Sequence, residues 1–141
     1  MTIEIPNVNY LAVLIASVIY SFIGALWYSP LMFGKIWMKS MGLTRTDIER
    51  EKNKGSIWKF YLANFLSNIV LVYILAVFLG VSNATSILGG MFLALLVWLG
   101  FIATVSVSRI LWEGKSLKLY IINAAYHLLS LNAAAILIIV I

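Results

Sequence analysis

The sequence contains no cysteine, which excludes a disulfide framework, a thiol nucleophile and a thiolate metal site. Charged residues are also scarce: they make up 11% of the 141 residues, whereas a soluble domain has about one quarter. Hydrophobic residues supply 63% of the chain, and the mean hydropathy is +1.03. This composition indicates a membrane protein rather than a soluble domain.

Acidic residues and histidine are few as well, with five Asp and Glu residues and one histidine, His127. A catalytic triad or a zinc site needs several such groups together, so we expect no enzyme, no catalytic residue, no metal site and no cofactor. Ten Lys and Arg residues give a net charge of +5. No recognisable nucleic-acid-binding module accompanies that charge, and basic residues in so apolar a chain usually set its orientation in a membrane. We therefore expect the lipid bilayer as a partner and no nucleic acid.

Four stretches without Asp, Glu, Lys or Arg are long enough to cross a bilayer core, which takes about 20 apolar residues. They cover residues 8–28, 60–79, 86–107 and 119–141. Spans and short connections account for nearly all of the sequence. The predicted fold is therefore an all-α integral membrane protein with four transmembrane helices, in a single domain over residues 1–141.

The basic residues are unevenly distributed along the chain. All ten Lys and Arg residues lie between the first and second spans or near the connection between the third and fourth. The N-terminus, the second connection (residues 80–85) and the C-terminus contain none. The positive-inside rule then places both basic connections in the cytoplasm and both termini outside.

The cytoplasmic connection, residues 31–57, has two different parts. The first, LMFGKIWMKSM, is apolar apart from Lys35 and Lys39, which share one helical face, and it fits an interfacial segment. The second is charged: Thr44 can cap a short helix with Asp47 in its first turn, and Gly55 can end it. This helical segment is compatible with a docking site, but charge runs are usually solvated faces, so a linker helix is favoured.

Uncharged polar residues recur at helical spacing within all four spans. With the predicted orientation they fall in the cytoplasmic half of the bundle or near its middle, which predicts one shared intramembrane cluster. Its members are Ser17, Ser21, Asn64, Asn68, Thr104, Asn123 and His127. Hydrogen bonding between helices is the simplest role for them, and a water-filled or ligand-binding vestibule is the alternative. His127 is expected to bond to one of the three asparagines rather than to carry protons.

The most unusual stretch is GALWYSPLMFGKIWMKSMG, which runs from Gly24 to Gly42. Pro30 lacks a backbone N–H and disfavours helical geometry at the residue before it, so the first span should kink or end there. Aromatic residues belong at headgroup level, with lysines on the cytoplasmic side. The stretch is therefore predicted to be a cytoplasmic-interface motif, which also borders the polar cluster. Its members are Trp27, Tyr28, Ser29, Pro30, Phe33, Gly34, Lys35 and Trp37.

The same region resembles the opening signature of a bacterial membrane family known as domain of unknown function 1761. The similar elements are Asn9-Tyr10, the Gly-x-x-Trp-Tyr-Ser-Pro run from Gly24, Phe-Gly-Lys from Phe33, Trp37, and Gly42-Leu43. GGMFLALLVWLGF in the third span is similar as well. The resemblance implies four helices and a bacterial cytoplasmic membrane, and it brings no activity or catalytic residues.

Taken together, these features predict a small multi-pass protein of the bacterial inner membrane with a structural or accessory role. Small residues such as Gly90 and Ala94 permit close helix contacts, and we expect a homo-oligomer. The alternative is an oligomeric channel or transporter for a small solute or ion, using the polar cluster. Any protein partner is left open.

Overall fold

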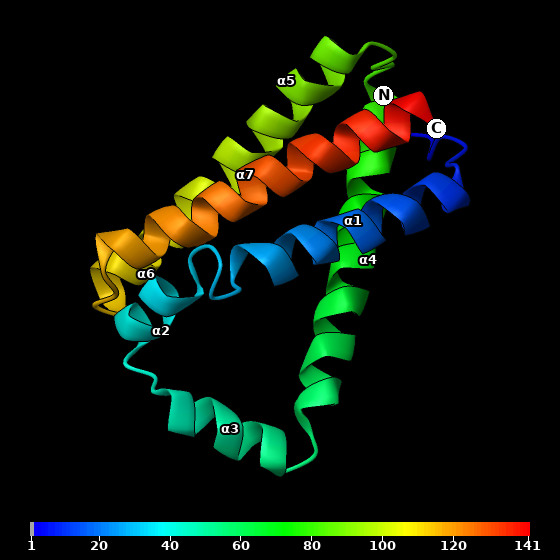
Figure 1. The fold of residues 1–141 in the computed structure, drawn as a ribbon. Helices are drawn as coiled ribbons and strands as arrows, with labels where there is room; N and C mark the ends of the chain where they lie inside the picture. Colours follow the sequence, from blue (N-terminus) through cyan, green and yellow to red (C-terminus); the bar gives the residue numbers. More distant parts are fainter. Residues whose placement is uncertain (1) are drawn as a thin grey trace.

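The computed structural model describes residues 2–141, in which the regular secondary structure is entirely helical, with no strand (Figure 1). The elements are α1 (Tyr10–Trp27), α2 (Gly34–Met41), α3 (Arg45–Asn53), α4 (Ile57–Val81), α5 (Ile87–Trp98), the π-helical turn η1 (Leu99–Ala103), α6 (Thr104–Trp112) and α7 (Leu117–Val140). Four helical stretches are long and apolar enough to cross a membrane: α1, α4, the continuous run Ile87–Trp112, and α7. The predicted all-α fold with four spanning helices is confirmed, and the chain is a multi-pass membrane protein.

The helix ends differ by a few residues from the predicted spans. The second helix begins at Ile57 and the third continues to Trp112, so both include basic residues, Lys59 and Arg109, in their terminal turns. Long basic side chains at helix ends can extend to the polar membrane surface while their stems stay on the helix. Spans predicted as stretches without charged residues are therefore shorter than the helices themselves.

Helix α7 is the centre of the packing (Figure 1). It lies along α1 on one side and along α5 on the other, and α4 crosses α1. The core contains the fully buried Tyr20, Val72, Leu75 and Leu131. Buried alanines on α1, α5 and α7 let the helix backbones approach closely, which is how helices associate in lipid. Gly90 and Ala94 are buried within the chain, where Gly90 faces Ile139 of α7.

Only the second half of α4 packs against the bundle. Its buried residues begin at Asn68 and continue to Leu79 at three- and four-residue spacing. Before Asn68 the side chains are mostly exposed, and Figure 1 shows this half of α4 diverging from α1 toward α3. The side chains of the first turns of α4 therefore point away from the rest of the chain.

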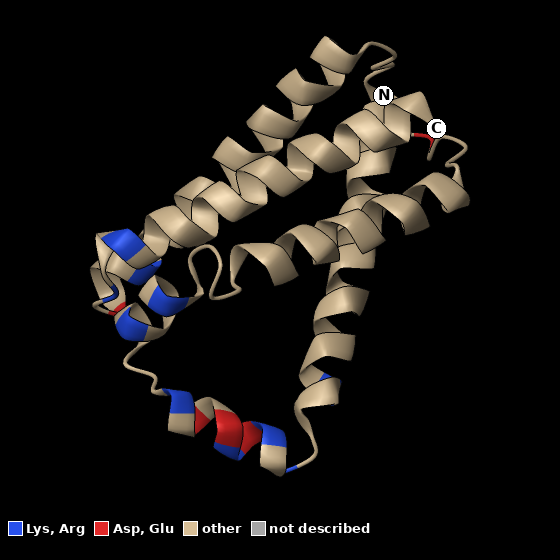
Figure 2. Cartoon of the chain, in the orientation of Figure 1, with Lys and Arg blue, Asp and Glu red and all other residues tan. Residues whose placement is uncertain are grey.

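The connection between α1 and α4 folds as its local chemistry predicts. Helix α1 ends at Trp27, three residues before Pro30. Thr44 caps α3 in a reciprocal arrangement: its hydroxyl accepts from the Asp47 backbone N–H at 3.2 Å, and the Thr44 N–H donates to the Asp47 carboxylate at 2.8 Å. Gly55 follows the helix with a φ of +72°, which glycine adopts without strain. Most charged residues gather at this end of the molecule, away from both termini (Figure 2).

Candidate functional site

Two short hydrogen bonds join α7 to α1 and its C-terminal end. The Tyr20 hydroxyl lies 2.6 Å from His127 Nδ1. The Tyr28 hydroxyl donates to Asn123 Oδ1, also at 2.6 Å. Asn123 and His127 are four residues apart, so both project from one face of α7. These two pairs are side-chain hydrogen bonds between the first and last spanning helices.

A third pair joins α4 to α1. Asn68, which is buried, donates through Nδ2 to Ser21 Oγ at 2.9 Å. Ser17 is also buried, but its hydroxyl donates to the carbonyl of Val13 in its own helix at 2.7 Å. Five members of the predicted cluster thus have hydrogen-bond partners within the protein: Ser17, Ser21, Asn68, Asn123 and His127.

The predicted single cluster is wrong for two of its members. Asn64 lies on the exposed half of α4, and its side chain makes no hydrogen bond within residues 2–141, because α4 has diverged from α1 at that point. Thr104 is exposed and donates to Gly100 of its own helix at 2.7 Å. The π-helical turn η1 directly before Thr104 changes which side chains face α7.

The expected partner of His127 is also wrong, because its partner is Tyr20 and none of the three asparagines. Sequence reasoning assigned aromatic residues to the membrane surface and so missed Tyr20. The available signal was the four-residue spacing of Tyr20, Gly24 and Tyr28, which places all three on one face of α1. That face packs against α7.

Tyr126 occupies the centre of this contact and was not predicted. Its ring lies 5.6 Å from that of Tyr20, 5.4 Å from that of Tyr28 and 4.7 Å from that of His127, measured between centroids. Its hydroxyl donates to the Tyr20 carbonyl at 3.3 Å. A Cβ atom at Gly24 would lie 2.7 Å from that hydroxyl, so glycine leaves the space that Tyr126 fills.

The interface motif folds back onto α7 instead of extending freely along the membrane. Trp27 Nε1 donates to the Ile122 carbonyl at 3.0 Å, and the Trp27 ring packs on Phe33. Tyr28 packs edge-on against Trp37 of α2.

The remaining members of the motif shape the turn between α1 and α2. Ser29 donates to the Leu26 carbonyl at 2.6 Å, and Gly34 is buried against the carbonyls of Tyr28 and Ser29. Pro30 and Lys35 are exposed. The motif therefore fixes how α1 and α2 sit on α7.

A second indole reaches α7 from the opposite side. Trp98 Nε1 donates to the Ala124 carbonyl at 2.7 Å. Ile122 and Ala124 are two residues apart and so lie on nearly opposite sides of α7. The indoles of Trp27 and Trp98 therefore bond α7 to α1 on one side and to α5 on the other. Tyr120 of α7 in turn donates to the Ala103 carbonyl of η1 at 3.0 Å.

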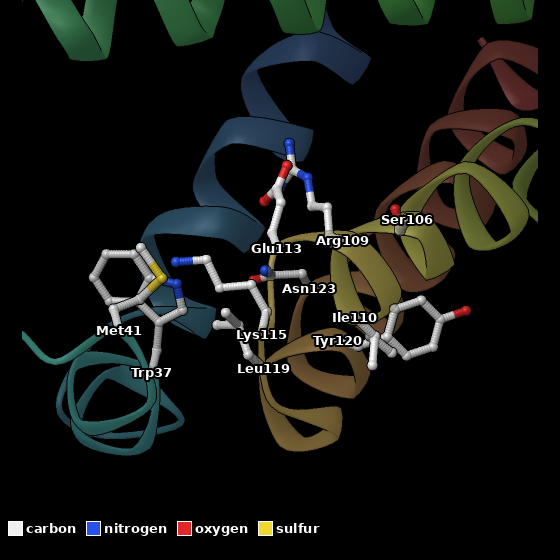
Figure 3. A pocket seen from close by; sticks show the side chains of 10 residues that line it. All are labelled: Trp37, Met41, Ser106, Arg109, Ile110, Glu113, Lys115, Leu119, Tyr120 and Asn123. Carbon is white, nitrogen blue, oxygen red and sulfur yellow. The ribbon is translucent and has the colours of Figure 1, made fainter.

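A cavity of about 380 Å³ opens at the charged end, between α2, α6 and the start of α7 (Figure 3). Of the predicted polar cluster, only Asn123 lines it. The cavity lining includes neither His127 nor Asn68, which a vestibule leading into the bundle would have to reach. The cavity is therefore separate from the Tyr20–His127 and Ser21–Asn68 pairs.

Comparison with known proteins gives one result. The family model described as "Protein of unknown function (DUF1761)" matches residues 11–139. Searches of curated proteins and of solved structures returned no match.

Proposed function

This chain belongs to the DUF1761 family of proteins of unknown function, and we propose that it is a structural or accessory membrane component that works by associating with copies of itself. Membership of this family does not indicate an activity, because the family is described as of unknown function. The proposal therefore rests on the geometry of the helices. We place the protein in a bacterial inner membrane, in keeping with its multi-pass character.

The observation that carries the proposal is the position of Asn64. It lies seven residues after the start of α4, about 10 Å along the helix at 1.5 Å per residue, beyond Lys59 and among exposed apolar side chains. Its side-chain amide makes no hydrogen bond within residues 2–141, and the hydrocarbon core of a bilayer offers no partner. An unpaired amide in an apolar medium is unfavourable by about 1–3 kcal/mol or more, which favours a protein partner at this point.

The chemistry of asparagine favours a second copy of the chain as that partner. The amide is both donor and acceptor, so two copies related by a twofold axis can pair Asn64 with Asn64. Phe60 and Tyr61, each 66% exposed, lie within one turn and supply apolar surface beside it. A single polar residue of this kind sets the alignment of associating helices.

The interior supports a structural role over a channel, a transporter or an enzyme. Ser21 and Asn68 bond to each other, and Asn123 accepts from Tyr28. The one histidine is engaged by Tyr20. These bonds join α1 to α7 and to α4, which is the role expected of structural contacts.

Self-association is tested by Asn64→Leu, with Ser67→Ala as the matched control. Ser67 lies on the same exposed half of α4, but its hydroxyl is bonded to Ala63 of its own helix at 3.0 Å. The measurement is the dimer fraction in liposomes by single-molecule photobleaching, as protein is diluted in lipid. Asn64→Leu should weaken dimerisation about 3- to 20-fold, the range expected for one interhelical hydrogen bond, and Ser67→Ala should not change it. A wild-type chain that is monomeric at every density would overturn the proposal.

We also propose that the charged end faces the cytoplasm and that both termini lie outside. The gathering of Lys and Arg at that end supports this orientation through the positive-inside rule (Figure 2). Because the sequence has no cysteine, single cysteines at positions 2 and 53 report it cleanly with an impermeant thiol reagent. In right-side-out vesicles position 2 should label and position 53 should not, and the reverse pattern would refute the orientation.

A further inference from the structure

The cavity between α2, α6 and α7 has a lining rich in hydrogen-bond donors. Arg109 and Lys115 contribute two cations, and neither is ion-paired within residues 2–141. Trp37 Nε1 donates no hydrogen bond in that range. Asn123 accepts from Tyr28 through Oδ1 and leaves its Nδ2 donor unused. A cavity lined by two cations and two unused neutral donors is suited to bind an oxyanion.

One acidic side chain opposes that preference. Glu113 also lines the cavity, so the lining carries two positive charges against one negative charge. The excess is one positive charge, supplemented by the two neutral donors. Glu113 therefore weakens the attraction for an anion without reversing it.

The rest of the lining is apolar apart from the hydroxyls of Ser106 and Tyr120, and the Tyr120 hydroxyl already donates to the Ala103 carbonyl. Met41, Ile110, the buried Leu119 and Tyr120 form walls around the polar groups, with Trp37 and Met41 on one side and Ile110 and Tyr120 on the other (Figure 3). The volume of about 380 Å³ lies in the range of small-molecule sites. It exceeds what a bare phosphate would fill, so the matching ligand is an anion with an apolar part.

The turn between α6 and α7 places the cavity at headgroup depth. Trp112 is 88% exposed and Leu111 72% exposed, and both precede Glu113 at the end of a spanning helix. Tryptophan at such an end sits among lipid headgroups. The cavity therefore opens where phospholipid phosphates are concentrated.

We propose that this cavity binds the phosphate group of an anionic phospholipid. Arg109 and Lys115 contact the phosphate, Trp37 and Asn123 donate to headgroup oxygens, and the apolar walls receive the first part of the acyl chains. Basic pockets between helices on one side of a membrane recognise anionic headgroups in this way. The site is distinct from the Asn64 surface of α4, so it stands or falls independently of self-association.

The experiment is native mass spectrometry of the full chain in detergent, titrated with phosphatidylglycerol and, separately, with phosphatidylcholine. Arg109→Gln/Lys115→Gln should lower phosphatidylglycerol binding about 25-fold, at about fivefold per cation. Lys35→Gln/Lys39→Gln removes two exposed charges from the same end but outside the cavity and should change binding less than threefold. Equal losses in both variants would mean diffuse surface charge and would overturn the proposal.

Two further arms keep the result interpretable. Glu113→Gln removes the opposing charge and should strengthen phosphatidylglycerol binding about threefold to fivefold, a gain that misfolding cannot produce. Glycerol phosphate or inorganic phosphate at millimolar concentration should not displace the lipid. Displacement by either soluble phosphate, or equal binding of phosphatidylcholine, would overturn the assignment to an anionic lipid.

Discussion

The hydrogen bond between Tyr20 and His127 offers the sharpest test of the interior. Tyr20→Phe removes one hydroxyl and keeps the ring, which continues to pack against Tyr126 and His127. His127 Nδ1 then loses the partner that lies 2.6 Å away. The substitution therefore measures a single polar contact between α1 and α7 rather than a change in packing.

Two opposing considerations set the expected loss in the free energy of unfolding of Tyr20→Phe. Leaving a buried polar group without its partner destabilises soluble proteins by about 1–3 kcal/mol. Interhelical bonds in membranes average about 0.6 kcal/mol with a maximum near 1.7, because the unfolded chain also finds partners. The Tyr20 bond is short and Tyr20 is fully buried, which places it at the upper end. We expect the free energy of unfolding to fall by about 1–2 kcal/mol.

The assay is SDS-induced unfolding in mixed micelles, arranged as a double-mutant cycle with His127→Leu. The coupling energy should be about 1 kcal/mol, since each single variant breaks the same bond. Tyr10→Phe is the control: Tyr10 is 71% exposed, and its hydroxyl makes no hydrogen bond within residues 2–141. The bond contributes nothing to stability if Tyr20→Phe lowers the free energy of unfolding no more than Tyr10→Phe does. The same follows if the effects of Tyr20→Phe and His127→Leu are additive. Either result would show that the structural interpretation of the interior is wrong.

Two other predictions concern the interface motif and the cap of α3. Gly34→Ala should lower the free energy of unfolding by about 2 kcal/mol or more in the same assay, because the added methyl group would collide with backbone carbonyls. Gly100→Ala is the control and should not destabilise the protein, because no atom lies within 4 Å of the added methyl group. Equal losses of stability in the two variants would refute this prediction. Hydrogen bonds from the Thr44 backbone N–H and then its hydroxyl lower the pKa of Asp47, so the cap is complete above the ordinary carboxyl pKa and is lost as pH falls through the lowered one. Cα chemical shifts of Arg45–Asn53 should show that acid transition, and Asp47→Asn should abolish it.

The parts of the fold that depend on local chemistry were predictable from the sequence. Spans follow from runs of apolar residues, the end of α1 from Pro30, and the start of α3 from the Thr44–Asp47 pair. Each of these features is decided within a few residues, so no knowledge of the neighbouring helices is needed. The resemblance to the DUF1761 family rested on a motif of the same local kind, and the family match confirms it.

The parts that depend on which face of a helix meets which neighbour were not predictable. Helix α4 is apolar on all sides, as membrane helices are, so the sequence gives no amphipathic stripe to show that it packs only from Asn68 onward. Asn64 and Asn68 therefore look equivalent, although one is exposed and the other bonds to Ser21. Polar spacing identified residues that make contacts, but their aromatic partners are fixed by tertiary packing.

The π-helical turn η1 has a consequence for how the third span tolerates change in length. A π turn contains about one residue more than an α turn, and one residue corresponds to about 100° around a helix. Deleting one residue between Leu99 and Ala103 would leave a span still long enough to cross the bilayer. Because the π turn already takes up one extra residue, the helix can close this deletion as a regular α turn and keep Arg109 and Ser106 facing the cavity they line. A deletion in the regular α-helical part of the span would instead rotate them by about 100° away from it. The same loss of one residue is therefore tolerated in η1 and disruptive in the neighbouring α-helical turns, although both lie within the same apolar span.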